Sequence, residues 1–281
     1  MKKFKFVLSS LALSSFALLG GTACSGDGSD DDSGVIPGEN GGETDENPDD
    51  DNDDETPDDM EEPDLVSLDC ANGAVPDVLE IAGVVEDIVG RNAAAGVTLE
   101  VFPAGATASI SSVTTDPSGN YALSIPTNGQ PWIGEIRASS DDYIPMHVFP
   151  SGLKESSEAL TIPALTPQAR QLASTLAGVT LDPNDALVIG FIFDCDEMGL
   201  EGATMSSDLE SGDFVYLLDD APFVDESQTS TAPSGVGVVL NAVSSSATPG
   251  KAKIGAQYGE RDWEVDVDVI PGEVSIALFI P

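Results

Sequence analysis

The side chains that most often carry enzyme chemistry are scarce in this 281-residue sequence. His147 is the only histidine, and no Gly-x-Ser-x-Gly turn presents a nucleophile to it. The sequence also lacks His-Glu-x-x-His, a phosphate-binding loop and a dinucleotide-binding glycine pattern. Carboxylates are plentiful, but a glycosidase pair also needs a cleft. We therefore predict no enzyme activity and no cofactor, and expect His147 to be a strand or loop residue near the surface.

Three short acidic segments supply the clustered oxygen ligands that calcium prefers. They are Asp141–Asp142, Asp194–Glu197 and Asp219–Asp220. None has the alternating acids, central glycine and terminal glutamate of an EF-hand loop. We interpret them as solvated turns and predict no metal site.

The first of the three cysteines, Cys24, follows an export signal. Lys2, Lys3 and Lys5 precede an apolar run and a group of small residues, so residues 1–23 are predicted to be a signal peptide. The ending Gly-Thr-Ala-Cys resembles the lipobox of bacterial lipoproteins, although Gly21 stands where that family prefers Leu, Val or Ile. The resemblance implies lipid attachment at Cys24 and a membrane contact through this lipid. The alternative is cleavage after Ala23, which would leave a soluble secreted protein.

The other two cysteines, Cys70 and Cys195, would meet an oxidising compartment after export. One remaining pair allows one intramolecular connectivity, so we predict a Cys70–Cys195 disulfide, with two buried free thiols as the alternative. The sequence has no Cys-x-x-Cys, which argues against a zinc or redox site.

Acidic residues dominate the charge of the chain, which is −40 in total. Residues 25–69 contain 20 acidic residues and no Lys or Arg. Such a segment cannot bury enough apolar surface to fold, so residues 24–69 are predicted to be a lipidated cysteine followed by a disordered acidic linker. The charge excludes nucleic acid as a partner. Cations, basic proteins and neutral glycans remain compatible partners.

From about residue 70 the sequence has the pattern of strands. Apolar residues alternate with polar ones in 97–101, 121–125 and 263–269, and Gly, Pro, Asn and Asp separate these runs. This pattern predicts β-sandwich structure. One helix is expected at 166–179, because Thr166 and Pro167 form a start signal and Gly178 a stop signal. It would separate β units at 70–165 and 180–281.

The two β units contain similar blocks in the same order. Residues 81–87 align with 188–194, 95–98 with 201–204, and 115–119 with 231–235. Repeats of this kind indicate a duplicated domain.

These blocks resemble the carboxypeptidase regulatory-like domains. The resemblance rests on Gly83-Val84-Val85, Asp87, Ala95-Gly96-Val97-Thr98 and Thr115-Asp116-Pro117-Ser118-Gly119-Asn120-Tyr121. It implies an all-β protein of two tandem transthyretin-like β-sandwiches, joined by one short helix and preceded by the disordered acidic tether. It also implies a non-catalytic role, because the family offers no catalytic residues.

The predicted function is a non-catalytic cell-envelope lipoprotein that acts as a surface interaction or structural module. Its predicted location is the outer membrane or cell surface, held by lipid. The alternative is a carbohydrate-binding module, which would need exposed aromatic side chains for stacking. Trp263 has the pattern of a core residue, whereas Trp132 is ambiguous. The sequence does not identify the protein or glycan partner.

Overall fold

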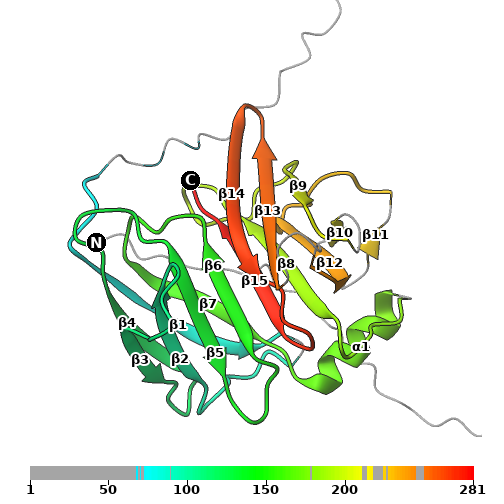
Figure 1. The fold of residues 1–281 in the computed structure, drawn as a ribbon, viewed down its shortest axis with the longest axis horizontal. Helices are drawn as coiled ribbons and strands as arrows, with labels where there is room; N and C mark the ends of the chain where they lie inside the picture. Colours follow the sequence, from blue (N-terminus) through cyan, green and yellow to red (C-terminus); the bar gives the residue numbers. More distant parts are fainter. Residues whose placement is uncertain are drawn as a thin grey trace, which may run out of the picture. The chain divides into compact units, whose positions relative to one another are not determined.

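The computed structural model describes residues 68, 70, 73–88, 90–177, 179–210, 214–217, 224–225, 227–244 and 250–281. The predicted signal peptide, the lipid-attachment residue Cys24 and nearly all of the predicted linker lie outside the described residues. Those that are described all belong to one compact unit, Val66–Pro281. They form fifteen strands and one helix (Figure 1).

The elements divide into two sets on either side of the helix. The first set is β1 (Val78–Asp87), β2 (Thr98–Pro103), β3 (Ser111–Thr114), β4 (Asn120–Pro126), β5 (Gly134–Ser139), β6 (Met146–Pro150) and β7 (Ser157–Ala164). The helix is α1 (Pro167–Ala177). The second set is β8 (Ala186–Ile192), β9 (Thr204–Ser207), β10 (Val215–Leu217), β11 (Val224–Asp225), β12 (Val236–Ala242), β13 (Lys251–Tyr258), β14 (Arg261–Asp268) and β15 (Val274–Phe279). We call these sets the first half and the second half.

Local sequence explains several of these elements directly. Strand β4 alternates buried Tyr121, Leu123 and Ile125 with exposed residues, as the period of two predicts. Helix α1 begins at Pro167, and the Thr166 hydroxyl accepts a hydrogen bond from the Ala169 N–H at 3.0 Å, which caps its first turn. The predicted all-β architecture with one short helix and several sheets is therefore confirmed.

The strands form three sheets. The largest has nine strands in the order β11-β10-β12-β8-β15-β6-β5-β2-β3. The two smaller sheets have the orders β4-β1-β7 and β14-β13-β9. In the large sheet, β15 runs parallel to both β8 and β6, whereas β12 and β5 are antiparallel to their neighbours.

The two halves have the same strand order. In the first half β1 pairs antiparallel with β4 and parallel with β7, and in the second half β8 pairs antiparallel with β12 and parallel with β15. The antiparallel series β6-β5-β2 of the first half likewise corresponds to β14-β13-β9 of the second.

The halves also share a hydrogen-bond motif around a buried threonine. Its hydroxyl accepts a bond from a backbone N–H at 2.9 or 3.0 Å and donates one to a carbonyl oxygen at 2.7 or 2.5 Å. The first set is Thr115, Val97 and Ala94, and the second set is Thr231, Ala203 and Leu200. Val97 and Ala203, and Thr115 and Thr231, are equivalent in the sequence blocks aligned above, and Ala94 and Leu200 directly precede the blocks 95–98 and 201–204.

Strands β6 and β15 join the halves into one sheet, a pairing that we call the seam. Its register runs from Val274 opposite Met146 to Leu278 opposite Pro150. The sequence predicted sandwiches linked by a helix and did not predict this shared sheet. Strands β8 and β15 are buried along their whole length, because alternate residues face two different hydrophobic cores. Val188 thus lies in one core and Ile189 in the other.

Candidate functional site

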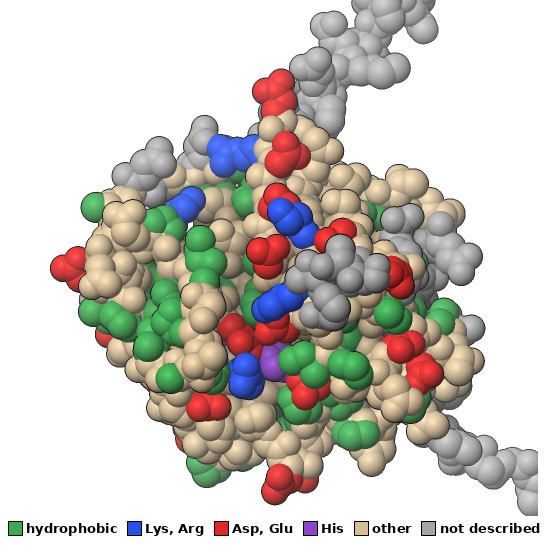
Figure 2. Space-filling model, viewed as in Figure 1, with side chains coloured by type: hydrophobic (Ala, Val, Ile, Leu, Met, Phe, Trp, Pro, Cys, Tyr) green, Lys and Arg blue, Asp and Glu red, His purple; other side chains and the backbone are tan. Residues whose placement is uncertain are grey.

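Ionisable side chains gather where the two halves meet. We call Glu135, Arg137, His147 and Glu273 the seam cluster. On the face shown in Figure 2, the histidine lies among acidic and basic side chains. Glu135 and Arg137 belong to β5, His147 belongs to β6, and Glu273 directly precedes β15. The cluster therefore contains residues from both halves.

His147 lies in the middle of the sheet. Along β6 it is opposite Arg137 of β5 on one side and Ser275 of β15 on the other. Only 2% of its surface is exposed. The sequence left open a strand or a loop position, and the structure shows a strand; the expectation of a place near the surface is wrong. The imidazole is buried because Glu135 and Glu273 lie against its two nitrogens and because β14, from another sheet, packs against β6.

Each ring nitrogen of His147 faces a carboxylate. Nδ1 lies 2.5 Å from Oε1 of Glu135, and Nε2 lies 2.5 Å from Oε2 of Glu273. A neutral imidazole carries one N–H, whereas the protonated ring carries two. The geometry therefore suits an imidazolium that donates to both carboxylates.

Arg137 holds the first of these carboxylates. Its Nε donates to Oε1 of Glu135 at 2.9 Å and its Nη2 donates to Oε2 at 3.1 Å. The guanidinium also lies over the ring of Phe102, 4.5 Å from the centroid. This bidentate pairing fixes the orientation of Glu135 towards His147.

The cluster shifts the ionisation of its own members. Burial alone would lower the pKa of His147, but the hydrogen bonds that its ring donates to Glu135 and Glu273 outweigh burial and raise it. Burial alone would raise the pKa of Glu135, but its bonds with His147 and Arg137 lower it. Both shifts favour the charged forms, so the seam cluster is an ionic bridge.

This arrangement does not suit nucleophilic catalysis. A general base needs a ring nitrogen available to the nucleophile, and both nitrogens of His147 face carboxylates. Ser275 lies opposite His147 across the seam but donates its hydroxyl to the backbone oxygen of Asp268. The chemistry that the cluster supports is the joining of β5, β6 and the start of β15.

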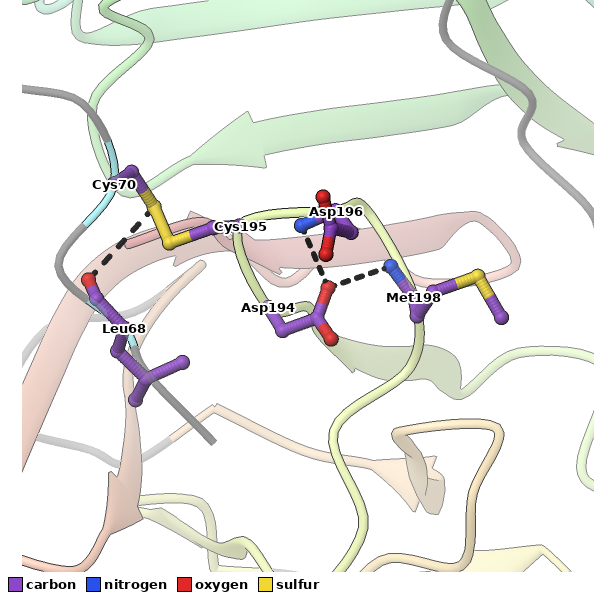
Figure 3. Close-up of a disulfide and its surroundings, with 6 residues drawn as sticks. All are labelled: Leu68, Cys70, Asp194, Cys195, Asp196 and Met198. Atoms are coloured by element: carbon purple, nitrogen blue, oxygen red, sulfur yellow. Dashed lines mark hydrogen bonds between the residues drawn. A yellow bond between two sulfur atoms is a disulfide. The ribbon is translucent and has the colours of Figure 1, made fainter. Parts of the chain in front are cut away.

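The predicted cysteine pair forms a disulfide in the structure (Figure 3). The Cα atoms of Cys70 and Cys195 are 5.2 Å apart, although 125 residues separate them in sequence. The bond connects the segment before β1 to the loop between β8 and β9. Within this loop, Oδ1 of Asp194 accepts hydrogen bonds from the N–H groups of Asp196 and Met198, each at 2.9 Å.

The acidic segments considered as calcium ligands do not converge. Asp194 shapes its own turn, and the Asp142 N–H donates to the Ser140 hydroxyl at 3.3 Å. Asp219 and Asp220 lie outside the described residues. Among the residues that the structure describes, no three or more His, Cys, Asp or Glu side chains are arranged so that they could hold a metal ion.

The two tryptophans differ in exposure. Trp132 is only 5% exposed and belongs to the first hydrophobic core, which settles its ambiguous pattern. Trp263 is half-buried and packs against the second core. A shallow hollow of about 550 Å³ lies along β9, β13 and β14, and Trp263 is part of its lining. Its lining includes Thr204, Ser206, Lys253, Gln257 and Glu264.

Comparison with known proteins gives only weak likenesses. No protein-family model matches the chain. No curated protein matches it either. Among solved structures, the Bacillus anthracis TIE protein is 10% identical over 72% of this chain with a TM-score of 0.23, and this chain spans about a third of it (33%). The shaft pilin SpaA of Lactobacillus rhamnosus GG is 8% identical, with 73% of this chain and 98% of the pilin covered and a TM-score of 0.25.

The BSP domain of a biofilm associated protein is 16% identical, with 71% of this chain and 30% of that chain covered and a TM-score of 0.19. Superpositions this weak carry no argument about function. The described part of the chain contains no helix long and apolar enough to cross a membrane.

Proposed function

We propose that this chain is a non-catalytic, lipid-anchored protein of the cell envelope whose folded part acts as a surface interaction or structural module. The observation that carries the proposal is that the ionisable residues of the seam cluster bind one another. The seam cluster engages both nitrogens of His147 in joining strands, which leaves the ring without a role in turnover. The export signal, Cys24 and the acidic segment before the fold support the anchor and its location.

We also propose that the two halves are copies of one transthyretin-like domain. The repeated strand order and the repeated threonine motif support a duplication. The proposed limits are 70–165 and 180–281, with the helix region 166–179 between them. The resemblance to carboxypeptidase regulatory-like domains is part of this proposal.

Protease treatment of intact cells tests the proposed location. We expect peptides from residues 70–281 to be released into the medium and identified by mass spectrometry, while a periplasmic control protein stays intact. Release only after the outer membrane is broken would refute the surface position and place the protein in the periplasm.

Metabolic labelling with a fatty-acid analogue tests the anchor separately. We expect label on the wild-type chain and none on Cys24→Ser, which should also move from the membrane fraction to the soluble fraction. Cys195→Ser serves as the matched control, because it removes a cysteine far from the export signal and should keep the label. Equal labelling of wild type and Cys24→Ser would refute lipid attachment at Cys24.

The carbohydrate-binding alternative would use Trp263 and not Trp132, because Trp132 is buried and Trp263 is half-buried and lines the hollow along β9, β13 and β14. A glycan would stack on this ring, and the hydroxyl, amide and charged side chains of the same hollow would offer hydrogen bonds. Binding to immobilised glycans that Gln257→Ala abolishes would favour this alternative over a protein partner.

A further inference from the structure

The seam has few backbone contacts for an interface that joins two halves. Strands β6 and β15 are the one pair among the described strands that connects the halves by a ladder, and their register covers five residue pairs. One of the five residues of β6 is Pro150, which has no N–H to donate. Side chains across the seam therefore matter to its stability.

The two halves share one hydrophobic core, and the ionic contact across the seam passes through a single imidazole. Glu135 belongs to the first half and Glu273 to the second, and His147 lies between them at 2.5 Å from each. When the ring is protonated, one cation binds two anions. When it is neutral, it keeps one N–H, so one carboxylate faces a ring nitrogen that carries a lone pair.

We propose that the Glu135–His147–Glu273 bridge is a pH-dependent latch on the seam, closed when His147 is protonated and loosened when the ring loses its proton. Loosening weakens the contact between β6 and β15 and raises the frequency with which their edges separate. The consequence is a surface that offers two strand edges in alkaline surroundings and hides them in acidic ones.

The other charges around the cluster do not replace the imidazolium. Arg137 binds Glu135 in bidentate fashion and also interacts with Glu100 of β2 and Asp268 of β14. Lys251 of β13 pairs with Asp268. Since Arg137 still provides a positive charge to Glu135 after His147 is deprotonated, Glu273 is the carboxylate that no longer faces the imidazolium cation.

The direction in which the stability of the seam changes with pH follows from the pKa shifts of His147 and Glu135. A raised pKa at His147 gives stabilisation that is complete below its ordinary value of about 6.5 and is lost as pH rises through the raised pKa. A lowered pKa at Glu135 gives stabilisation that is complete above its ordinary value and is lost as pH falls through the lowered pKa. The seam is therefore tightest between these two titrations.

The protonation state of His147 can be measured directly, because it is the only histidine in the chain. An NMR titration of the full-length protein should show one imidazole whose midpoint lies above about 6.5. In Glu273→Gln the midpoint should fall, because a neutral amide does not favour the charged ring. A wild-type midpoint below the ordinary value, or one unchanged in Glu273→Gln, would overturn the proposal.

Hydrogen exchange tests whether this titration opens the seam. After correction for the intrinsic pH dependence of exchange, opening of β6 and β15 should increase across the His147 titration. The expected increase is about tenfold for each unit by which folding raises the pKa of His147. Peptides from β1 and β4 serve as the internal reference and should not change. His147→Gln should show a seam that exchanges faster and no longer responds to this titration. A wild-type seam that follows the reference peptides at every pH would refute the latch.

Discussion

At the scale of single residues, Gly83 shows how closely β1 and β7 approach. A Cβ atom at this position would lie 1.8 Å from the backbone oxygen of Leu160, which belongs to the strand paired with β1. We expect Gly83→Ala to lower the free energy of unfolding by about 3 kcal/mol or more, because the parallel pair must separate to admit the methyl group. Chemical denaturation measures the loss.

Gly73→Ala is the matched control for this substitution, because a Cβ atom there would meet nothing within 4 Å. It should change the stability by no more than about 0.5 kcal/mol. Equal losses in the two variants would show that the contact with Leu160 does not decide the role of Gly83.

The residue scale is also where sequence analysis reached its limit. The pattern around His147 was compatible with a strand or a loop, and the structure places the residue on β6. It could not reveal the two carboxylates, because Glu135 and Glu273 lie 12 and 126 residues away. A solitary histidine in an acidic chain carries no local sign of such partners. The sequence signal that could have helped is that His147 lies among the apolar residues Met146, Val148 and Phe149, all of which are buried in the structure.

At the scale of elements, helix α1 does more than separate two β units. Arg170 is 7% exposed and donates to the backbone oxygens of Gly272 at 3.2 Å, Asp182 at 2.9 Å and Asp185 at 2.7 Å. These carbonyl groups belong to loops that lead into β8 and β15. The helix is therefore fastened to the second half.

We predict that Arg170→Ala lowers the free energy of unfolding by about 2–3 kcal/mol, because it leaves these carbonyl groups without a charged donor. The neighbouring Gln171 is exposed, so Gln171→Ala should cost less than about 0.5 kcal/mol. Thermal denaturation of the two variants side by side gives the comparison. An Arg170→Ala protein as stable as the Gln171→Ala protein would contradict this role for the helix.

Sequence patterns predicted individual helices and strands better than they predicted which strands pair with one another. Strands with one solvent face, such as β4, alternate in the expected way. Strands β8 and β15 do not alternate, because both of their faces are covered. The sequence does not state which strand a fully buried strand will pair with. For this reason the seam between β6 and β15 was not predicted, whereas the helix and the alternating strands around 97–101, 121–125 and 263–269 were.

At the scale of the whole molecule, the disulfide fixes the segment that leads into the fold. It closes a loop across a sequence separation of 125 residues, which contains the whole first half. In the chain-entropy picture, a loop of this length stabilises the folded state by restricting the unfolded chain. We expect the double variant Cys70→Ser/Cys195→Ser to lose about 2–4 kcal/mol of stability relative to the oxidised protein.

Peptide mapping without reductant should recover a peptide pair that contains Cys70 and Cys195 and separates after reduction. Denaturation of the wild-type protein with and without reductant should reproduce the loss seen in the double variant. Two free thiols in the protein isolated from the cell envelope would contradict the pairing.

The position of this bond also determines how the folded part would respond to tension. A pull on the chain that precedes Cys70 acts first on Leu68, which is buried in the second core, and then passes from Cys70 through the covalent bond to Cys195. From there it reaches the central sheet, since the Phe193 N–H donates to the Phe279 oxygen at the end of β15. Strand β1 follows Cys70 within the loop that the disulfide closes, so the load bypasses it. A protein tethered at its N-terminus in flowing medium would therefore not unravel from its first strand.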